Sequence, residues 1–321
     1  MQTTTAAPPA DVIPDSRVGW KQKGTMLALT IIPFVAFVAA VALLWNTAVG
    51  WTDLGLLVVL YVFCGFGITI GFHRMLTHSA FEAVKPLKAS LLIFGSMAVQ
   101  GSAITWAVDH RTHHAHSDKE GDPHSPHHGF GGGLGGQLRG LVHAHMGWMF
   151  VHPPAESRDR LGRDLVDDPM ISFFDRTFLF WSVMSFLVPF GLGYALTGSW
   201  GGAFTGLLWG GLVRLFLNHH ITWSVNSICH FFGRRPFAAY DQSTNNWLLA
   251  IPSLGEAWHH NHHVFPTSAF HGLSWRQVDI SGWLIAGWEK LGLVRNVRRV
   301  SPEQMARKLA RAQQAARHAE S

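Results

Sequence analysis

Histidine is concentrated in two similar short segments of this chain and in one looser pair. Residues 109–114 are Asp-His-Arg-Thr-His-His, and residues 259–263 are His-His-Asn-His-His. In both segments histidines stand at positions i, i+3 and i+4 on one helical face, so a short helix can direct three imidazoles toward one point. The two segments supply six imidazoles and the looser pair supplies two more. Eight nitrogen ligands are too many for one metal ion and suit two. These candidate ligands are His73, His78, His110, His113, His114, His259, His262 and His263.

Composition places these histidines in a membrane protein. Of the 321 residues, 48% are hydrophobic and only 14% are charged, whereas soluble domains carry about 25% charged residues. The formal charge of +5 comes from basic residues that flank apolar segments, which fits lipid headgroups and gives no stripe for nucleic acid. The two cysteines cannot form a disulfide framework, and Cys64, inside an apolar run, is expected to pack in the core.

The ligand types narrow the choice of metal. Imidazole suits zinc, copper, iron and nickel, and the absence of cysteine ligands disfavours structural zinc. No His-Glu-x-x-His motif of zinc proteases occurs, and Glu256-x-x-His259 is a single copy of a pattern that soluble di-iron carboxylate proteins carry twice. Redox-inactive zinc would not explain so many ligands beside a membrane. The pattern therefore predicts two irons that activate oxygen for attack on a hydrophobic chain. His260 lies on a different helical face and is left out.

The expected fold is an all-α integral membrane protein with four transmembrane helices, an interfacial helix and a cytosolic histidine-rich cap that holds the di-iron site. Uncharged apolar runs of this length span about 30 Å of hydrocarbon. A further apolar stretch, Leu87–Ile104, is interrupted by glycine and glutamine and is expected at the interface. If it crossed, His73 and His110 would lie on opposite sides of the membrane. The four predicted spans are about 25–45, 54–72, 178–196 and 203–217.

These spans divide the chain into three parts. Residues 1–16, rich in Thr, Ala and Pro, are expected to form a disordered tail. Residues 17–300 form the membrane domain, in which 73–176 and 218–300 make the cap. Residues 301–321 form a C-terminal tail, with a solvated helix over about 302–318.

Charge asymmetry predicts the orientation. The links 46–50 and 197–202 contain no Lys or Arg, whereas the other ends of all four spans are flanked by basic residues. The positive-inside rule therefore places both termini and all histidine segments in the cytosol. The flanking residues are Arg17, Lys21, Lys23, Arg74, Arg158, Arg160, Arg163, Arg176, Arg234 and Arg235.

Two histidine positions are ambiguous on spacing alone. His73 and His78 are five residues apart, about 140° on a continuous helix, so we expect them where the second span ends and unwinds. His230, after the fourth span, is a lone histidine, for which a packing role is the simpler interpretation.

With these residues identified, the chain resembles the membrane fatty acyl desaturases, specifically the stearoyl-CoA (delta-9) group. Five motifs occur in the family's order across roughly residues 50–280. They are Gly71-Phe72-His73-Arg74-x-x-x-His78, Trp106-Ala107-x-Asp109-His110-Arg111-Thr112-His113-His114, Asp122-Pro123-His124, Thr222-Trp223-x-Val225-Asn226-Ser227-x-x-His230 and Gly255-Glu256-Ala257-Trp258-His259-x-x-His262-His263-x-Phe265-Pro266.

The resemblance implies nine histidine ligands for two irons, because it adds His230 to the eight above, and it implies that Asn226 contacts one iron through water. It implies a narrow, kinked tunnel for the acyl chain, lined by Trp106 and Trp223, for which interfacial anchoring is the alternative. It also implies that dioxygen and two external electrons remove one hydrogen from each of two adjacent methylenes, leaving a cis double bond, with no side chain as general base. Asp109 and Glu256 would orient ligand imidazoles or cap helices.

Two departures from the family pattern bear on substrate and partners. Val108 stands where animal-type members carry an arginine that helps hold the CoA phosphates, so either the stretch Arg158–Arg163 replaces it or the substrate is a lipid-bound chain. No His-Pro-Gly-Gly haem motif and no nucleotide fingerprint occur, so electrons are expected from a separate ferredoxin-like or flavin reductase protein. The alternatives are a membrane di-iron hydroxylase of alkyl chains and a histidine-rich metal transporter.

Overall fold

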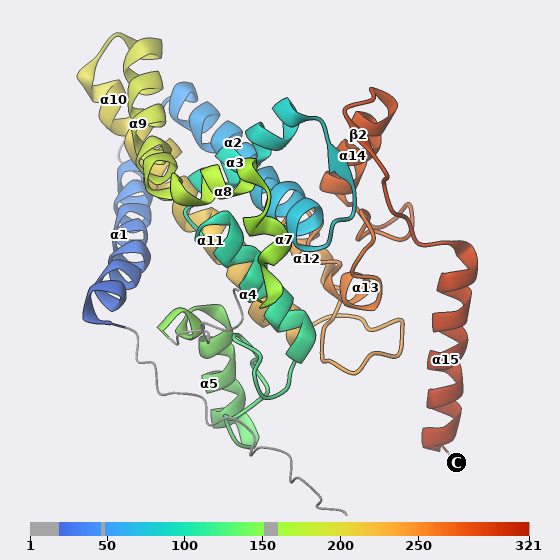
Figure 1. Ribbon diagram of the computed structural model, residues 1–321. Helices are drawn as coiled ribbons and strands as arrows, with labels where there is room; N and C mark the ends of the chain where they lie inside the picture. The colour runs from blue at the N-terminus through green and yellow to red at the C-terminus, as the bar shows by residue number, and fades with distance from the viewer. Residues whose placement is uncertain (1–18, 46–48, 151–159, 321) are drawn as a thin grey trace, which may run out of the picture.

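The computed structural model describes residues 19–45, 49–150 and 160–320 and shows an almost entirely helical molecule (Figure 1). The predicted tail 1–16 and Arg158 lie outside the described residues. The membrane-side helices are α1 (Trp20–Trp45), α2 (Trp51–Phe66), η1 (Gly67–Thr77), α9 (Phe178–Thr197), α10 (Trp200–Gly206), η3 (Leu207–Val213), α11 (Arg214–Ser227) and η4 (Ile228–His230). The remaining elements are β1 (Glu82–Ala83), α3 (Lys85–Met97), α4 (Ala103–His116), α5 (Gly133–His145), η2 (Gly147–Phe150), α7 (Arg163–Val166), α8 (Pro169–Arg176), α12 (Trp247–Ala250), α13 (His259–Val264), α14 (Ile280–Lys290), β2 (Val294–Arg295) and α15 (Pro302–Glu320).

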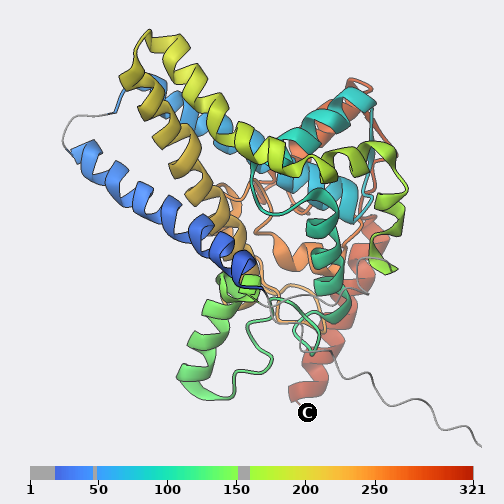
Figure 2. The same cartoon turned by 60° about the vertical axis from the view of Figure 1, so that its left-hand side comes forward.

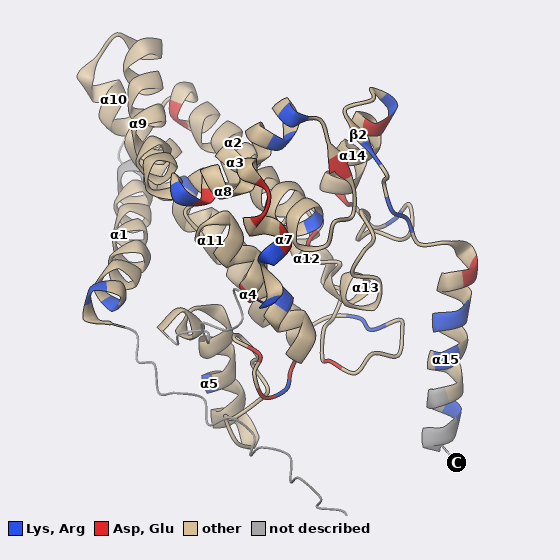
Figure 3. Cartoon of the chain, in the orientation of Figure 1, with Lys and Arg blue, Asp and Glu red and all other residues tan. Residues whose placement is uncertain are grey.

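Four helices are long and apolar enough to cross a membrane, as predicted. They cover Trp20–Ala42, Trp51–Thr77, Phe178–Thr197 and Trp200–His230. The second and fourth run well beyond the predicted ends, because η1 and α11 continue α2 and α10 without a break. Figure 3 shows that α9 and α10 carry no charged residue, and that α1 carries its lysines at one end.

The stretch predicted to lie at the interface covers most of α3, the turn that follows it and the first two residues of α4. α3 ends at Met97 and α4 begins at Ala103, with Val99 and Gly101 at positive φ between them. The thirteen residues of α3 reach about 20 Å at 1.5 Å per residue, too short for the hydrocarbon core. Among the described residues, neither helix qualifies as a candidate span.

Small residues let the spanning helices approach closely. Gly202, Gly206 and Gly210 recur at intervals of four on one face, and a Cβ added to Gly206 would lie 2.6 Å from the carbonyl oxygen of Pro189 in α9. Such stripes replace the hydrophobic driving force that is missing between helices in lipid. Deeper along the same interface, the fully buried Arg214 donates to Ser185 Oγ at 2.5 Å and to the Met97 carbonyl at 3.2 Å. It thereby joins α11 to α9 and to the end of α3.

The cap is assembled around the end of the second spanning helix. Its core contains Ile70 and Phe72 of η1, Leu92 of α3, Ile104 of α4 and Ile285 of α14. Strands β1 and β2 pair antiparallel, Glu82 with Arg295, and tie the end of η1 to the segment after α14. In Figure 1, α15 stands apart from this core, whereas in the turned view of Figure 2 it overlaps the cap in projection. The described side chains along it are largely exposed.

Candidate metal centre

Nine buried or half-buried histidines converge in the cap and form two groups. Within each group the ligand atoms all lie within 4.8 Å of one another. The five-histidine group contains His73, His78, His110, His114 and His262, and the four-histidine group contains His113, His230, His259 and His263. All the histidines predicted as ligands, including His230, therefore fall in one group or the other.

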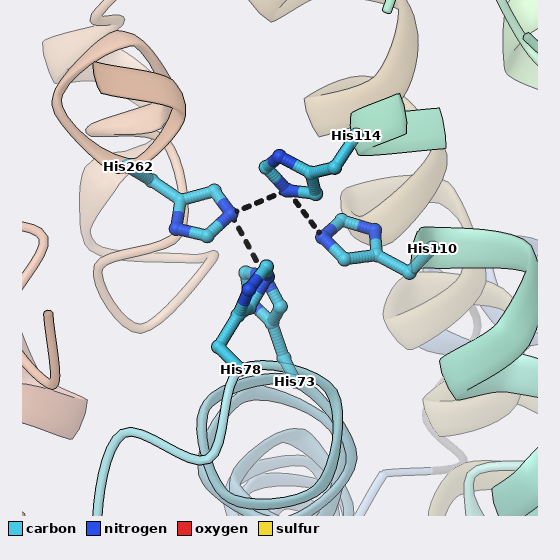
Figure 4. A group of neighbouring side chains, drawn as sticks. All are labelled: His73, His78, His110, His114 and His262. Carbon is cyan, nitrogen blue, oxygen red and sulfur yellow. Dashed lines mark hydrogen bonds between the residues drawn. The ribbon is translucent and has the colours of Figure 1, made fainter. Parts of the chain in front are cut away.

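Figure 4 shows the five-histidine group, with its rings converging from three segments of the chain. The Nε2 atoms of His114 and His262 lie 2.8 Å apart, those of His110 and His114 lie 3.1 Å apart, and those of His73 and His262 lie 3.1 Å apart. In the four-histidine group the closest Nε2 atoms belong to His230 and His259, at 3.0 Å.

Each predicted histidine segment serves both groups, so the expectation that a segment points at one position is wrong. On α4, His110 and His114 are one turn apart and reach the five-histidine group, while His113 turns into the other. α13 divides in the same way, because His262 joins the five-histidine group and His259 and His263 join the four-histidine group. The two helices face each other across the site, so each lies between the groups.

His73 and His78 lie where the second span ends, as predicted, but the helix does not unwind between them, because the π-helix η1 carries His73, ends at Thr77 and has His78 as its C-cap. In this geometry the backbone bonds run from i to i+5, and the His78 N–H donates to the His73 carbonyl at 3.2 Å. Residues five apart then lie nearly above one another, and the two ring centroids are 5.0 Å apart. The wider turn converts a spacing unsuited to an α-helix into one shared face.

The short helix α13 is positioned by buried polar contacts. Asn245 Oδ1 accepts the Asn261 N–H at 3.1 Å, and Asn261 Nδ2 donates to the His271 carbonyl at 2.8 Å. Before the helix, Gly255 has φ of 109°, and a Cβ there would lie 2.2 Å from Asp279 Oδ1. Only glycine allows this approach, which brings the segment carrying Glu256 and His259 against α14.

A buried ion network connects this segment to η1. Glu256 contacts His73 Nδ1, and its other oxygen accepts from Arg74 Nη2 at 3.0 Å. Arg74, which is fully buried, also donates to Asp279 Oδ1 at 2.9 Å. Glu256 thus contacts the ring of one candidate ligand, and its orienting role stays a prediction.

The chemistry of the four-histidine group fits a bound metal ion. Nδ1 of His113 lies 2.9 Å from Asp122, and Nδ1 of His263 lies 3.0 Å from Asp241. A carboxylate only accepts hydrogen bonds, so both Nδ1 atoms carry the proton and each neutral ring presents a lone pair at Nε2. These two Nε2 atoms face each other at 3.3 Å, and a cation between them would satisfy both lone pairs.

Electrostatics keep most of these rings in the ligand form. Burial, with the neighbouring histidines adding to it, holds the pKa of His110, His114, His262 and His263 well below its ordinary value. Neutral imidazole is the form that binds metals. Burial would also lower the pKa of His113, but the charge and hydrogen bond of Asp122 raise it above its ordinary value.

Four other predicted residues line a neighbouring cavity of about 350 Å³. They are Trp106, Asp109, Trp223 and Asn226. The Trp106 ring stacks on His110 with centroids 5.2 Å apart. Burial raises the pKa of Asp109 to about 7, yet within the described part of the chain no hydrogen bond joins it to a ligand imidazole, so its predicted orienting role gains no support. No hydrogen bond to a described histidine is seen for Asn226 either.

Sequence reasoning missed three carboxylates and one histidine. Asp118, Asp122 and Asp241 hold rings of the four-histidine group, although Asp122 appeared in one of the quoted motifs. His271 is buried, its ring centroid is 4.4 Å from that of His262, and its Nδ1 lies 3.6 Å from Glu256, although neither ring nitrogen has a hydrogen-bond partner among the described atoms. Only the nearness of Asp118 and Asp122 to the first histidine segment could have indicated a role.

Comparison with known proteins supplies the remaining evidence. Residues 50–279 match the family model described as fatty acid desaturase. The chain is 42% identical over 273 residues to a hex-5-enoyl-[acyl-carrier protein] acetylenase from Moorena producens (strain JHB), covering 85% of each chain. It is 37% identical over 256 residues to an sn-1 stearoyl-lipid 9-desaturase from Anabaena variabilis, covering 79% of this chain and 87% of the relative. An acyl-CoA C20 Delta5-desaturase from Anemone leveillei is 34% identical over 316 residues, 93% of each chain.

Proposed function

This chain belongs to the fatty acid desaturase family, and from that premise we propose that it introduces a cis double bond at the delta-9 position of a saturated acyl chain. The resemblance predicted from the histidine motifs is confirmed, and relatives include 9-desaturases. The protein is thus a membrane oxidoreductase acting on fatty acyl chains. The delta-9 position is our proposal, since named relatives also act at other positions.

The cavity beside the metal centre is the observation that carries this proposal. Its lining is mainly apolar and includes Met26 and Leu29 of α1 and Ile68 of η1, and it reaches both histidine groups through His110 and His259. Its volume of about 350 Å³ suits a small elongated ligand. We propose that an acyl chain lies here, with Trp106 and Trp223 along its path, so that one C–C bond is held beside the metals.

We propose that two iron ions occupy the two groups, with the nine histidines as ligands and Asn226 contacting one ion through water. When bound, the irons would supply the redox chemistry by which dioxygen and two external electrons remove two hydrogens and yield water. The protein's own part is to orient imidazoles through Glu256 and the three aspartates, to keep most of the rings neutral by burial, and to fix the acyl chain. No side chain is required to act as a general base.

The substrate is a chain on CoA or on a lipid, and the electrons come from a separate ferredoxin-like protein or flavin reductase. Val108 in place of the family's arginine favours the lipid-bound form, and so do relatives named acyl-lipid desaturases. Other relatives are named as acyl-CoA desaturases, so a CoA-bound chain is the alternative substrate to be tested.

We propose that the metal centre and both termini face the cytosol, with 17–300 as the membrane domain between two tails. The start of α1 at Gln22, the end of η1 at His73, the start of α9 at Phe178 and the end of α11 at Asn226 all line the one cavity. These four helix ends therefore lie on the same side of the membrane, and they are the ends flanked by Lys and Arg.

The test is to express the wild type and His113→Ala in a host lacking delta-9 desaturation, and to locate double bonds in its fatty acids by mass spectrometry. His128→Ala is the matched control, because His128 is exposed and belongs to neither group. New 9-monoenes are expected from the wild type and the control only. Double bonds at another position would refute delta-9, whereas hydroxylated chains would indicate a hydroxylase. Triple bonds would indicate an activity like that of the acetylenase relative. Metal uptake without altered fatty acids, with an electron donor supplied, would favour a transporter.

A further inference from the structure

The two histidine groups differ in the side chains that contact Nδ1, the ring nitrogen facing away from the other histidines. In the four-histidine group, three of the rings donate from Nδ1 to separate aspartates. All six side chains are largely buried, with none more than 11% exposed. The pairs are His113 with Asp122 at 2.9 Å, His230 with Asp118 at 3.0 Å, and His263 with Asp241 at 3.0 Å.

These three aspartates accept hydrogen bonds from backbone N–H groups. Asp122 accepts the N–H of Asp118 at 2.8 Å, and Asp118 accepts the N–H of Gln242 at 2.6 Å. In the described structure, the only Lys or Arg within ion-pair distance of the three is Arg235, 3.9 Å from Asp241 and itself 30% exposed. Three carboxylates and this distant, partly exposed guanidinium leave about two to three negative charges behind the ligands.

The five-histidine group has far less negative charge. Among the described residues, Glu256 is the one carboxylate that contacts its rings, and Arg74 bridges Glu256 and Asp279. Two carboxylates and one guanidinium leave about one negative charge. The Nδ1 atom of His262 has no partner in the described structure, so this ring is not oriented by any carboxylate.

We propose that this charge difference makes the two metal positions unequal, so that the four-histidine group binds a divalent cation first and more tightly. The aspartates Asp118, Asp122 and Asp241 act as positioning residues that set this order. The inference rests on the metal binding included in the proposed function, and it goes further by ranking the two positions.

The competing consideration is the number of ligands, because the other group has one more imidazole. A neutral ring adds a bond but no charge, and a dication in a dry interior bears a large desolvation cost unless negative charge lies nearby. Partners that accept from a ligand's second ring nitrogen also raise its basicity, and their removal typically lowers metal affinity about 10–100-fold. Charge and basicity both favour the four-histidine group.

The test is a titration of the metal-free, full-length protein in detergent with Co²⁺, in competition with a chelator of known affinity. Visible absorption reports the cobalt bound to histidine. We expect two binding steps whose dissociation constants differ at least tenfold. His259→Ala should remove the tighter step, and His110→Ala the weaker one. Asp241→Asn should weaken the tighter step about 10–100-fold and leave the weaker step unchanged.

The matched control is Asp164→Asn, which removes a cap carboxylate that pairs with Arg111 and contacts no histidine of either group. It should leave both steps unchanged. Two equal steps in the wild type, or a tighter step that survives His259→Ala, would overturn the inference. Equal weakening of both steps by Asp241→Asn would give that aspartate a general structural role and also overturn it. Desaturation with two equal steps would refute this inference alone, whereas ordered binding without any desaturation would refute the proposed function alone.

Discussion

The crossing of η1 over α3 gives a prediction whose size follows from the geometry. A Cβ on Gly67 would lie 2.1 Å from the main-chain nitrogen of Gly95 and 2.4 Å from the carbonyl carbon of Phe94. The first distance is more than 1 Å short of the 3.4 Å at which ordinary contact begins, and main-chain atoms cannot rotate away. Gly67→Ala must therefore push the two helices apart, at a typical overpacking cost of about 1–3 kcal/mol.

The same substitution at Gly55 provides the control, because a Cβ there meets nothing within 4 Å and the residue is exposed on α2. Gly55→Ala should stabilise the helix by about 0.4–1 kcal/mol through the unfolded chain. The two variants should thus differ by about 1.4–4 kcal/mol when unfolding in SDS is followed by tryptophan fluorescence.

Gly67→Ala should also weaken metal binding, because the displaced η1 carries His73 and is followed directly by His78, its C-cap. Co²⁺ absorption of the two variants measures this effect. If Gly67→Ala were as stable as Gly55→Ala and bound cobalt normally, the close approach of the helices would not be what positions these ligands.

Three further outcomes are expected. Arg74→Met leaves the buried Glu256 and Asp279 without their partner and should cost about 3–5 kcal/mol in SDS unfolding; a loss below about 1 kcal/mol would contradict a structural role for the network. Chelation of the metal should lower the thermal unfolding midpoint, and restored Fe²⁺ should raise it. A ligand that binds the native state at a hundred times its Kd adds about 2.7 kcal/mol to the free energy of unfolding. An unchanged midpoint would argue against metal-linked folding. His145 contacts His220 and Ser227, and burial lowers its pKa. The neutral form of this ring therefore stabilises the fold above the ordinary pKa of 6.5. This contribution to stability is lost as pH falls below that value. Hydrogen exchange over 133–145, corrected for intrinsic rates, should therefore rise as pH falls from about 7 to about 5, and His145→Asn should weaken this dependence; equal dependence in both proteins would contradict it.

Local patterns in the sequence were sufficient for the spanning helices and for the set of clustered histidines. Apolar runs without charge mark a spanning helix wherever they occur, because the hydrocarbon imposes the same demand on every segment. Spacings of three and four place His110, His113 and His114 on neighbouring positions of one helix, and the structure places them on α4. The ends of the second and fourth spans were missed, because hydropathy falls where polar ligand-bearing turns continue the helix.

The division of the histidines into two groups was decided only by the tertiary structure. His110 and His113 are three residues apart, yet they belong to different groups because α4 lies between η1 on one side and η4 on the other. The π-helical turn at His73 depends on the close contact of η1 with α3, which leaves no trace in the spacing of its residues. Asp241 reaches His263 from a separate loop. A sequence therefore shows which residues can bind a metal, but the pairing of ligands and carboxylates depends on which helix ends meet in space.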